Sequence, residues 1–118
     1  MPDQAVEYEL APARVGELAN AQLIDVRTAA EYHAGHVPGA RHVPLEELQD
    51  AAGELEPGRP VVFYCRSGDR SALAVDAFRA SGWDAYAIGG GLVAWAGEGL
   101  PLEPEDGDVA HHSGLPPA

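Results

Sequence analysis

The sequence contains no lysine and a single cysteine, and its seven basic residues, all arginine, stand against 19 acidic ones. The resulting formal net charge of −12 argues against a nucleic-acid partner, because such a chain repels phosphate backbones. The lone Cys65 excludes an internal disulfide and a metal site built from several thiolates. No stretch approaches the roughly 18 consecutive apolar residues of a membrane span, and no basic and apolar leader opens the sequence. These absences predict a cytoplasmic protein that binds neither nucleic acid nor membrane.

The composition fits one globular domain followed by a polar tail. The 118 residues, of which 46% are hydrophobic and 22% charged, are enough for a single modest core. Beyond Leu102 the chain becomes acidic and rich in turn residues. Such a segment has too little apolar surface to offset the entropy lost on ordering. We therefore expect one domain over residues 6–102 and a disordered acidic tail over residues 103–118.

Short apolar runs alternate with helical patterns along the domain. The expected strands cover residues 8–10, 22–26, 40–43, 60–64 and 84–88, and the expected helices cover residues 12–20, 45–52, 71–81 and 92–95. The runs at 22–26 and 60–64 lack polar alternation, which is typical of parallel strands buried on both faces. The alternation of strands and helices predicts an α/β fold with a mainly parallel sheet.

The strongest chemical signal lies in residues 65–71, between the best strand and the best helix. In an open parallel sheet, ligands bind beyond the carboxyl ends of the strands, where Cys65 falls. A tight loop that enters a helix directs backbone N–H groups inward and holds anions, and Gly68 permits the necessary backbone angles. Helix N-termini and arginines lower a cysteine pKa from ~8.5 to about 3.5–7.5, so Arg66 and Arg70 favour a nucleophilic Cys65 thiolate.

The alternative is that Cys65 is the last buried residue of its strand, which is the commoner role of a lone cysteine. The two arginines, the glycine and the strand-to-helix position favour the nucleophile instead. Asp69 opposes part of the positive field unless its carboxylate points outward.

Four segments, in the right order, resemble the single-domain rhodanese-like sulfurtransferases over nearly all of residues 6–102. They are residues 23–27 (Leu-Ile-Asp-Val-Arg), residues 31–32 with 35–40 (Glu-Tyr and Gly-His-Val-Pro-Gly-Ala), residues 64–71 (Tyr-Cys-Arg-Ser-Gly-Asp-Arg-Ser), and residues 89–91 (Gly-Gly-Gly) with Trp95. The resemblance implies a twisted, five-stranded, mostly parallel sheet flanked by helices on both faces.

The resemblance also implies a two-step reaction that needs no cofactor and no metal. Cys65 attacks the outer sulfur of thiosulfate or of a persulfide donor. The Cys65 persulfide then passes that sulfur to cyanide or a thiol. Because the chain has no second cysteine, the acceptor must come from outside, and a protein acceptor is one candidate.

By the same resemblance, Cys65 is the nucleophile and the rest of the loop binds the substrate. The expected binding residues are Arg66, Ser67, Gly68, Asp69, Arg70 and Ser71. Arg70 takes the place of a loop-closing arginine. Ser71 either hydrogen-bonds the sulfur or caps backbone groups, and its position at the start of a helix favours capping.

The signature residues outside the loop are expected to serve the structure. Asp25, Arg27 and Glu31 are predicted to form a hydrogen-bonded network at the strand end. A metal site at His33, His36 and His42 is disfavoured, because no cysteine joins them and the spacing of the carboxylates is unremarkable.

Two rival functions remain to be weighed. Related folds use a cysteine loop in phosphatases and arsenate reductases, which resemble Cys-x5-Arg, whereas only four residues separate Cys65 from Arg70. The shorter loop favours sulfur over phosphate. A binding or regulatory module is disfavoured because rhodanese-like domains without catalysis typically lack the cysteine. A protein-to-protein sulfur carrier stays open, since it uses the same loop.

Overall fold

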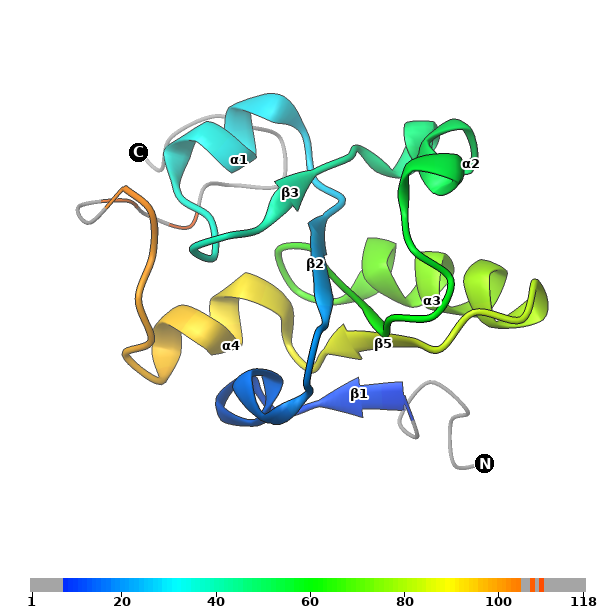
Figure 1. The fold of residues 1–118 in the computed structure, drawn as a ribbon. Helices are drawn as coiled ribbons and strands as arrows, with labels where there is room; N and C mark the ends of the chain where they lie inside the picture. Colours follow the sequence, from blue (N-terminus) through cyan, green and yellow to red (C-terminus); the bar gives the residue numbers. More distant parts are fainter. Residues whose placement is uncertain (1–7, 105–106, 108, 110–118) are drawn as a thin grey trace.

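Five parallel strands form the centre of the molecule (Figure 1), in a computed structural model that describes residues 8–104, 107 and 109. The strands are β1 (Glu9–Leu10), β2 (Gln22–Asp25), β3 (Arg41–His42), β4 (Val61–Tyr64) and β5 (Ala85–Ile88). Their order across the sheet is β1-β5-β4-β2-β3, and all four neighbouring pairs are parallel. The predicted α/β fold with its five-stranded sheet is therefore confirmed.

The central strand β4 is buried along its whole length, as its unbroken apolar run predicts. Successive side chains of a strand point to opposite faces of the sheet. Val61 and Phe63 accordingly join one core cluster, whereas Val62 and Tyr64 join the other. The sheet thus separates two apolar cores, each of which needs its own covering layer.

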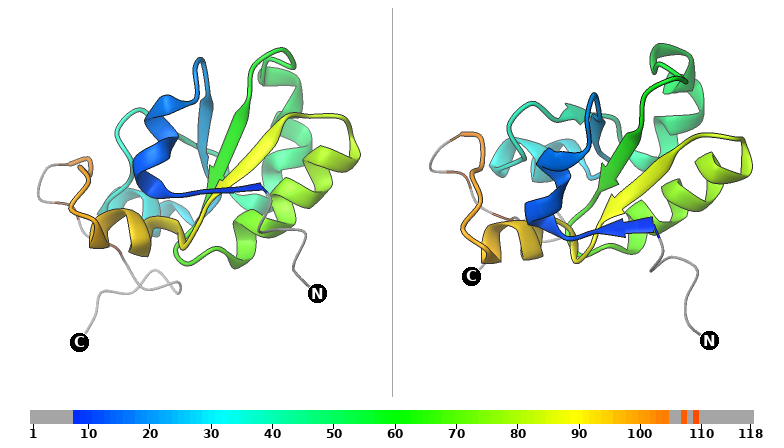
Figure 2. Two further views of the ribbon diagram at one scale, coloured as in Figure 1. Left: turned by 90° about the horizontal axis from the view of Figure 1, so that it is seen from below. Right: turned by 60° about the horizontal axis from the view of Figure 1, so that its bottom comes forward.

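Helices supply both layers. They are η2 (Pro12–Glu17), α1 (Ala29–Ala34), η3 (Leu45–Glu47), α2 (Leu48–Ala51), η4 (Ala52–Glu54), α3 (Asp69–Ala80) and α4 (Gly91–Gly97), where η marks a 3-10 helix. α2 and α3 pack on the face that carries Phe63, while η2 and α4 pack on the opposite face (Figure 2). Among the described residues, no helix has the length and apolar character needed to cross a membrane.

Three helical segments differ from the expectation. The expected helix at 12–20 is a 3-10 helix that stops at Glu17, and its N-cap residue Ala11 offers no side-chain hydrogen bond. The eight-residue pattern at 45–52 is divided among η3, α2 and η4, since 3-10 turns commonly form the ends of short helices. α1 was not expected, because its alanine-rich sequence has no apolar periodicity. Its signal is the Thr28–Glu31 capping box instead.

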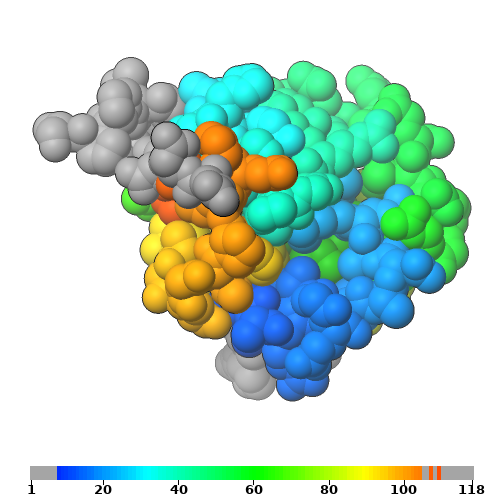
Figure 3. Space-filling model, turned by 60° about the vertical axis from the view of Figure 1, so that its left-hand side comes forward, coloured from blue at the N-terminus to red at the C-terminus, as the bar shows by residue number. Residues whose placement is uncertain are grey.

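The described part of the expected tail lies on the domain. Glu103 forms an antiparallel bridge with His36, in which the His36 N–H donates to the Glu103 carbonyl (3.0 Å) and the Glu103 N–H donates back (2.8 Å). Figure 3 shows this orange segment against the cyan residues that precede β3. Val109 packs against the core cluster under α4. Contacts with the domain therefore extend beyond residue 102, while residues 105, 106, 108 and 110–118, on which the expected disorder of the tail also falls, lie outside the described residues.

Candidate active site

Cys65 directly follows β4 at the carboxyl edge of the sheet. β2 and β4 are paired in register, with Asp25 opposite Tyr64, so the segments that follow these two strands start side by side. The N–H of Leu92, in the first turn of α4, donates to the Cys65 carbonyl at 2.8 Å. The fold therefore holds the cysteine between the end of β2, the start of α3 and the start of α4.

Gly91 makes the close approach of α4 possible. A Cβ atom at this position would lie 2.5 Å from the Cys65 carbonyl oxygen and 2.6 Å from that of Arg66. Its φ of +62° is also one that residues with a side chain rarely adopt. This contact explains the glycine-rich motif before Trp95, since only a glycine lets the helix meet the cysteine loop.

The sulfur of Cys65 sits in a cradle of donors. Its Sγ accepts the Gly68 N–H at 3.0 Å and the Ser71 N–H at 3.5 Å, and it lies 3.6 Å from the Ser71 Oγ. Gly68 has a φ of +124°, which turns the loop back onto the sulfur before α3 begins. Cys65 is only 1% exposed. Backbone N–H groups at the start of α3 thus face a nearly enclosed sulfur, an arrangement that stabilises negative charge there.

Ser71 contacts both the loop backbone and the sulfur. Its hydroxyl donates to the Gly68 carbonyl at 3.1 Å, and the same oxygen lies 3.6 Å from the Cys65 sulfur. The hydroxyl has one proton for these two neighbours and can also accept a hydrogen bond. The bond to Gly68 is not a helix cap, because Gly68 is itself the N-cap residue of α3 and no side-chain hydrogen bond caps the helix there.

Arg70 connects the loop to α1. Its Nη1 and Nη2 donate to the two carboxylate oxygens of Glu31 at 2.8 and 3.1 Å. The Glu31 side chain is fully buried and also accepts hydrogen bonds from the backbone and hydroxyl of Thr28. Burial alone would raise the pKa of Glu31, but the bonds from Arg70 and Thr28 outweigh it and lower that pKa. The bond to Glu31 in turn raises the pKa of Arg70.

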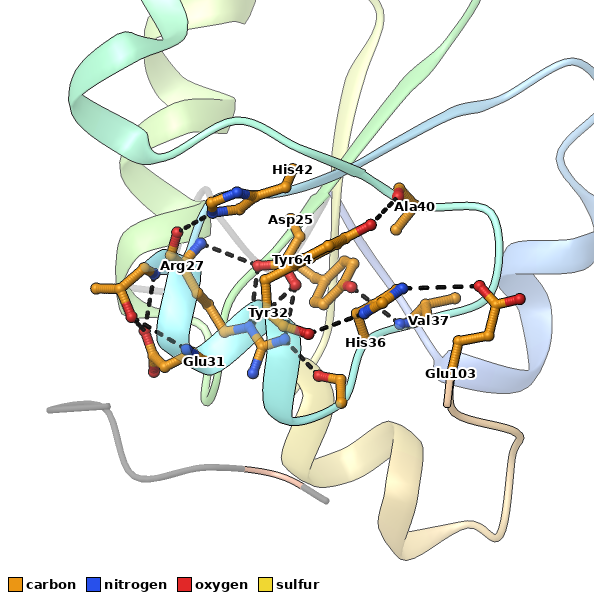
Figure 4. A network of polar contacts seen from close by, with 12 residues as sticks. Asp25, Arg27, Glu31, Tyr32, His36, Val37, Ala40, His42, Tyr64 and Glu103 are labelled. Carbon is orange, nitrogen blue, oxygen red and sulfur yellow. Dashed lines mark hydrogen bonds and ion pairs between the residues drawn. The ribbon is translucent and has the colours of Figure 1, made fainter. Parts of the chain in front are cut away.

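A second buried ion pair lies at the end of β2 (Figure 4). Arg27 Nε donates to Asp25 Oδ1 at 2.9 Å and Nη2 to Oδ2 at 2.7 Å, and both side chains are fully buried. The same Nη2 also donates to the Gly35 carbonyl at 2.7 Å, which fixes the backbone at the C-terminal end of α1. The predicted Asp25–Arg27 link is therefore confirmed, whereas Glu31 pairs with Arg70.

Two histidines together with Tyr32 and Tyr64 surround the buried ion pair at the end of β2. Tyr32 lies between His36 and His42, with ring centroids 3.8 and 4.8 Å away. Tyr64, whose role the sequence did not indicate, accepts the Val37 N–H at 3.0 Å (Figure 4). Burial and then the charge of Asp25 raise the pKa of Tyr64, so its hydroxyl stays protonated. Within the described residues, no group of three His, Cys, Asp or Glu side chains is placed to hold a metal ion.

A small pocket of about 240 Å³ gives access to the loop. Its lining residues are Cys65, Arg66, Ser67, Asp69 and Arg70. The structure thus brings together the predicted loop residues, with Gly68 and Ser71 directly on the sulfur. The exposed Asp69 lies at the mouth of the pocket, where its carboxylate opposes the arginines.

An open parallel sheet with a cysteine cradled between a strand and a helix places the chain in a class of α/β proteins that carry a cysteine loop at the carboxyl edge of the sheet. Within that class, the sequence matches the family described as "Rhodanese-like domain" over residues 11–98, and the chain belongs to this family.

Individual relatives agree with this assignment. The chain is 33% identical over 103 residues to a sulfurtransferase of Allochromatium vinosum, which covers 86% of this chain and 96% of the relative. It is 39% identical over 98 residues to an HTH-type transcriptional regulator of Mycobacterium tuberculosis, covering 80% of this chain but only 42% of that regulator. A crystal structure of a rhodanese-related protein from Thermoplasma volcanium superimposes with a TM-score of 0.74 and 26% identity, over 80% of this chain and 95% of that one.

Proposed function

We propose that this protein is a sulfurtransferase that moves a sulfane sulfur from thiosulfate or a persulfide donor to cyanide or a thiol. Cys65 carries the sulfur as a persulfide. The observation that supports this most directly is the convergence of the Gly68 and Ser71 N–H groups on the Cys65 sulfur. Such donors stabilise the Cys65 thiolate, which is the nucleophile in the first step and the leaving group in the second.

Each step of the reaction breaks one sulfur–sulfur bond. The Cys65 thiolate attacks the outer sulfur of thiosulfate, and sulfite leaves with the electron pair of the broken bond. Cyanide then attacks the outer sulfur of the Cys65 persulfide, so thiocyanate forms and the thiolate is restored. A thiol acceptor reacts in the same way and becomes a persulfide. The chain's own groups suffice, and no step requires a metal or cofactor.

The site supports phosphoryl transfer less well. A phosphate pocket needs a guanidinium that can donate hydrogen bonds to several phosphate oxygens. In this structure both Nη atoms of Arg70 donate to the carboxylate of Glu31. Only four residues separate Cys65 from Arg70, and the loop amides that contact Cys65 converge on its sulfur instead of on a space beyond it.

A protein-to-protein sulfur carrier with little thiosulfate activity is the second candidate. It is supported by the balance of charge around the pocket, where Arg27, Arg66 and Arg70 are matched by Asp25, Glu31 and Asp69. A dianion such as thiosulfate gains little electrostatic attraction from a site whose formal charges cancel.

Intact-mass analysis tests the proposed function. Incubation with thiosulfate should add the mass of one sulfur atom, and cyanide should remove it with release of thiocyanate. Cys65→Ser should show neither change. Thiocyanate formation by Cys65→Ser at the normal rate would overturn the assignment, as would the absence of any adduct with both thiosulfate and a small persulfide donor.

A further inference from the structure

An apolar groove of about 400 Å³ runs between α3 and the helical segment 45–54. Its principal lining residues are Leu45, Leu48, Ala52, Leu73, Ala77 and Phe78. Leu73 is 62% exposed, and Val93 is the only other large hydrophobic side chain classed as exposed among the described residues. Together the exposed leucine and the apolar lining of the groove offer a continuous apolar surface that a second molecule can cover.

The groove begins one helical turn from the Cys65 pocket. Leu73 and Asp69 are four residues apart on α3, so their side chains are neighbours about 6 Å apart along the helix axis. Asp69 lines the pocket and Leu73 lines the groove. On the opposite wall, the Leu45 N–H donates to the Val26 carbonyl at 3.1 Å, at the carboxyl end of β2. The groove and the Cys65 pocket are therefore adjacent along α3.

Both helical segments that form the groove also carry exposed carboxylates, and these make up its acidic rim. They are Glu46, Glu47, Asp50, Asp69 and Asp76, which belong to the same segments as the lining residues but lie outside the lining itself. None of them forms an ion pair with another residue that the structure describes. Residues 45–54 contain no arginine, and on α3 the two arginines are already engaged, Arg70 with Glu31 and Arg79 with Tyr8 and the Ala85 carbonyl.

We propose that this groove docks a separate, basic protein that inserts an aliphatic side chain beside Leu73 and exchanges sulfur with Cys65. This inference rests on the proposed function and names the partner of the same site. The charge of the rim selects the partner, because an acidic surface attracts a basic one and repels its own kind. A second copy of this chain would place acidic rim on acidic rim. The chain's own residues after Leu102 include four acidic residues and no arginine or lysine.

The transfer itself is balanced. The partner's thiolate attacks the outer sulfur of the Cys65 persulfide, a new sulfur–sulfur bond forms on the partner, and the Cys65 thiolate leaves with the electrons of the old one. The reverse reaction loads Cys65 from a partner persulfide. The groove supplies proximity, which raises the rate without altering the chemistry.

Two synthetic peptides of equal length test the proposal. Each has one cysteine and two leucines, and one carries arginines where the other carries glutamates. With Cys65 loaded as the persulfide, the arginine peptide should accept sulfur about tenfold faster than the glutamate peptide, and added NaCl should reduce the difference. Every rate is divided by the rate of discharge to cyanide, so changes in intrinsic reactivity cancel.

Variants then locate the docking site. Leu73→Ser should reduce the normalised rate of the arginine peptide about tenfold, and the pair Glu47→Gln with Asp50→Asn should weaken the salt dependence of that rate. Val93→Ser and Glu98→Gln, which change matching exposed side chains on or beside α4, should leave the normalised rate within twofold. A preference for arginine that Leu73→Ser does not alter would overturn the groove as the site.

A binding measurement separates this proposal from the proposed function. Fluorescence anisotropy with peptides that have serine in place of cysteine involves no sulfur transfer. Binding of the arginine peptide that depends on Leu73, in a protein that takes up no sulfur, would retain the docking site and reject the function. If the Cys65 persulfide forms and discharges to cyanide but the protein binds both peptides equally, the function would be retained and the docking site rejected. If the protein is a dimer that Leu73→Ser dissociates, the groove binds a second copy of the chain. If neither peptide binds and the NMR signal of the Leu73 methyl groups is insensitive to a soluble paramagnetic agent, the chain's own terminal residues cover the groove. Either result overturns the proposed partner.

Discussion

Arg70 grips Glu31 through two parallel hydrogen bonds, of 2.8 and 3.1 Å, and so ties the start of α3 to the start of α1. The two residues are 39 positions apart in the sequence. Gly68 and Ser71, which donate to the Cys65 sulfur, stand on either side of Arg70 in the sequence. We therefore expect Arg70 to brace the loop as well as to contribute charge.

Substitution of Arg70 distinguishes these two contributions. A lysine keeps the charge but cannot form two parallel bonds to one carboxylate. Arg70→Lys and Arg70→Ala should therefore both lose sulfur transfer, by roughly ten- to hundredfold, if about 1.5–3 kcal/mol of a charge-assisted bond is felt in the transition state. Thiocyanate formation at matched enzyme concentrations measures this. Near-normal activity of Arg70→Lys beside an inactive Arg70→Ala would show that charge alone matters.

Glu31 makes the stability of the fold dependent on pH at the acidic end. Its pKa is lower in the folded state than in the unfolded chain, where a glutamate titrates near 4.3. The unfolded chain therefore binds more protons in this range, and the stabilisation is complete above about pH 4.3 and lost as the pH falls through the folded pKa. In Glu31→Gln this part of the acid dependence should disappear, together with a large part of the stability at neutral pH. Urea unfolding of both proteins across the acidic range measures the difference, and parallel curves would contradict the prediction.

Gly91 should tolerate no side chain. Gly91→Ala would place a methyl group within 2.5 Å of the Cys65 carbonyl oxygen and hold the residue at a φ of +62°, so α4 or the loop must move. We expect a loss of about 1–3 kcal/mol in the free energy of unfolding, with slower formation of the persulfide. Gly97→Ala is the matched control in the same helix, because nothing lies within 4 Å of its added methyl group. Equal stability of the two variants would contradict the close contact.

Hydrolysis of aryl phosphates should be negligible. The guanidinium of Arg70 is already bound to Glu31, and the amides of Gly68 and Ser71 meet at one sulfur atom. Release of p-nitrophenol by the wild-type protein should match that of Cys65→Ser. Vigorous hydrolysis that depends on Cys65 would refute the interpretation of the loop.

The sequence predicted the features that depend on local patterns. Strands β2 and β4 were evident because burial on both faces requires an unbroken apolar run, and the cysteine loop was evident because a glycine and two arginines follow a buried strand. α1 was missed because six residues dominated by alanine show no apolar stripe, although the Thr28–Glu31 capping box marks its start. Glu31 was grouped with its sequence neighbours Asp25 and Arg27, since nothing local indicates a partner 39 residues away.

The segment after Leu102 gives the last prediction, and here the sequence and the structure lead to different expectations. An acidic stretch with little apolar surface predicts that its removal leaves folding and sulfur transfer nearly intact. Glu103, however, docks through its backbone, with hydrogen bonds of 3.0 and 2.8 Å to His36, and backbone pairing leaves no signature in side-chain composition. At about 0.5–1.5 kcal/mol for each bond, deletion of residues 103–118 should cost at least about 1 kcal/mol. For a domain of this size that corresponds to a melting temperature lowered by roughly 4 °C or more.

Glu103→Gln is the control, because it keeps both backbone bonds and removes only the charge of a side chain that is 59% exposed. Its melting temperature should stay within about 1 °C of the wild type. Differential scanning calorimetry of the three proteins decides the matter: an unchanged midpoint after the deletion would mean that the bridge to His36 adds nothing to the stability of the domain.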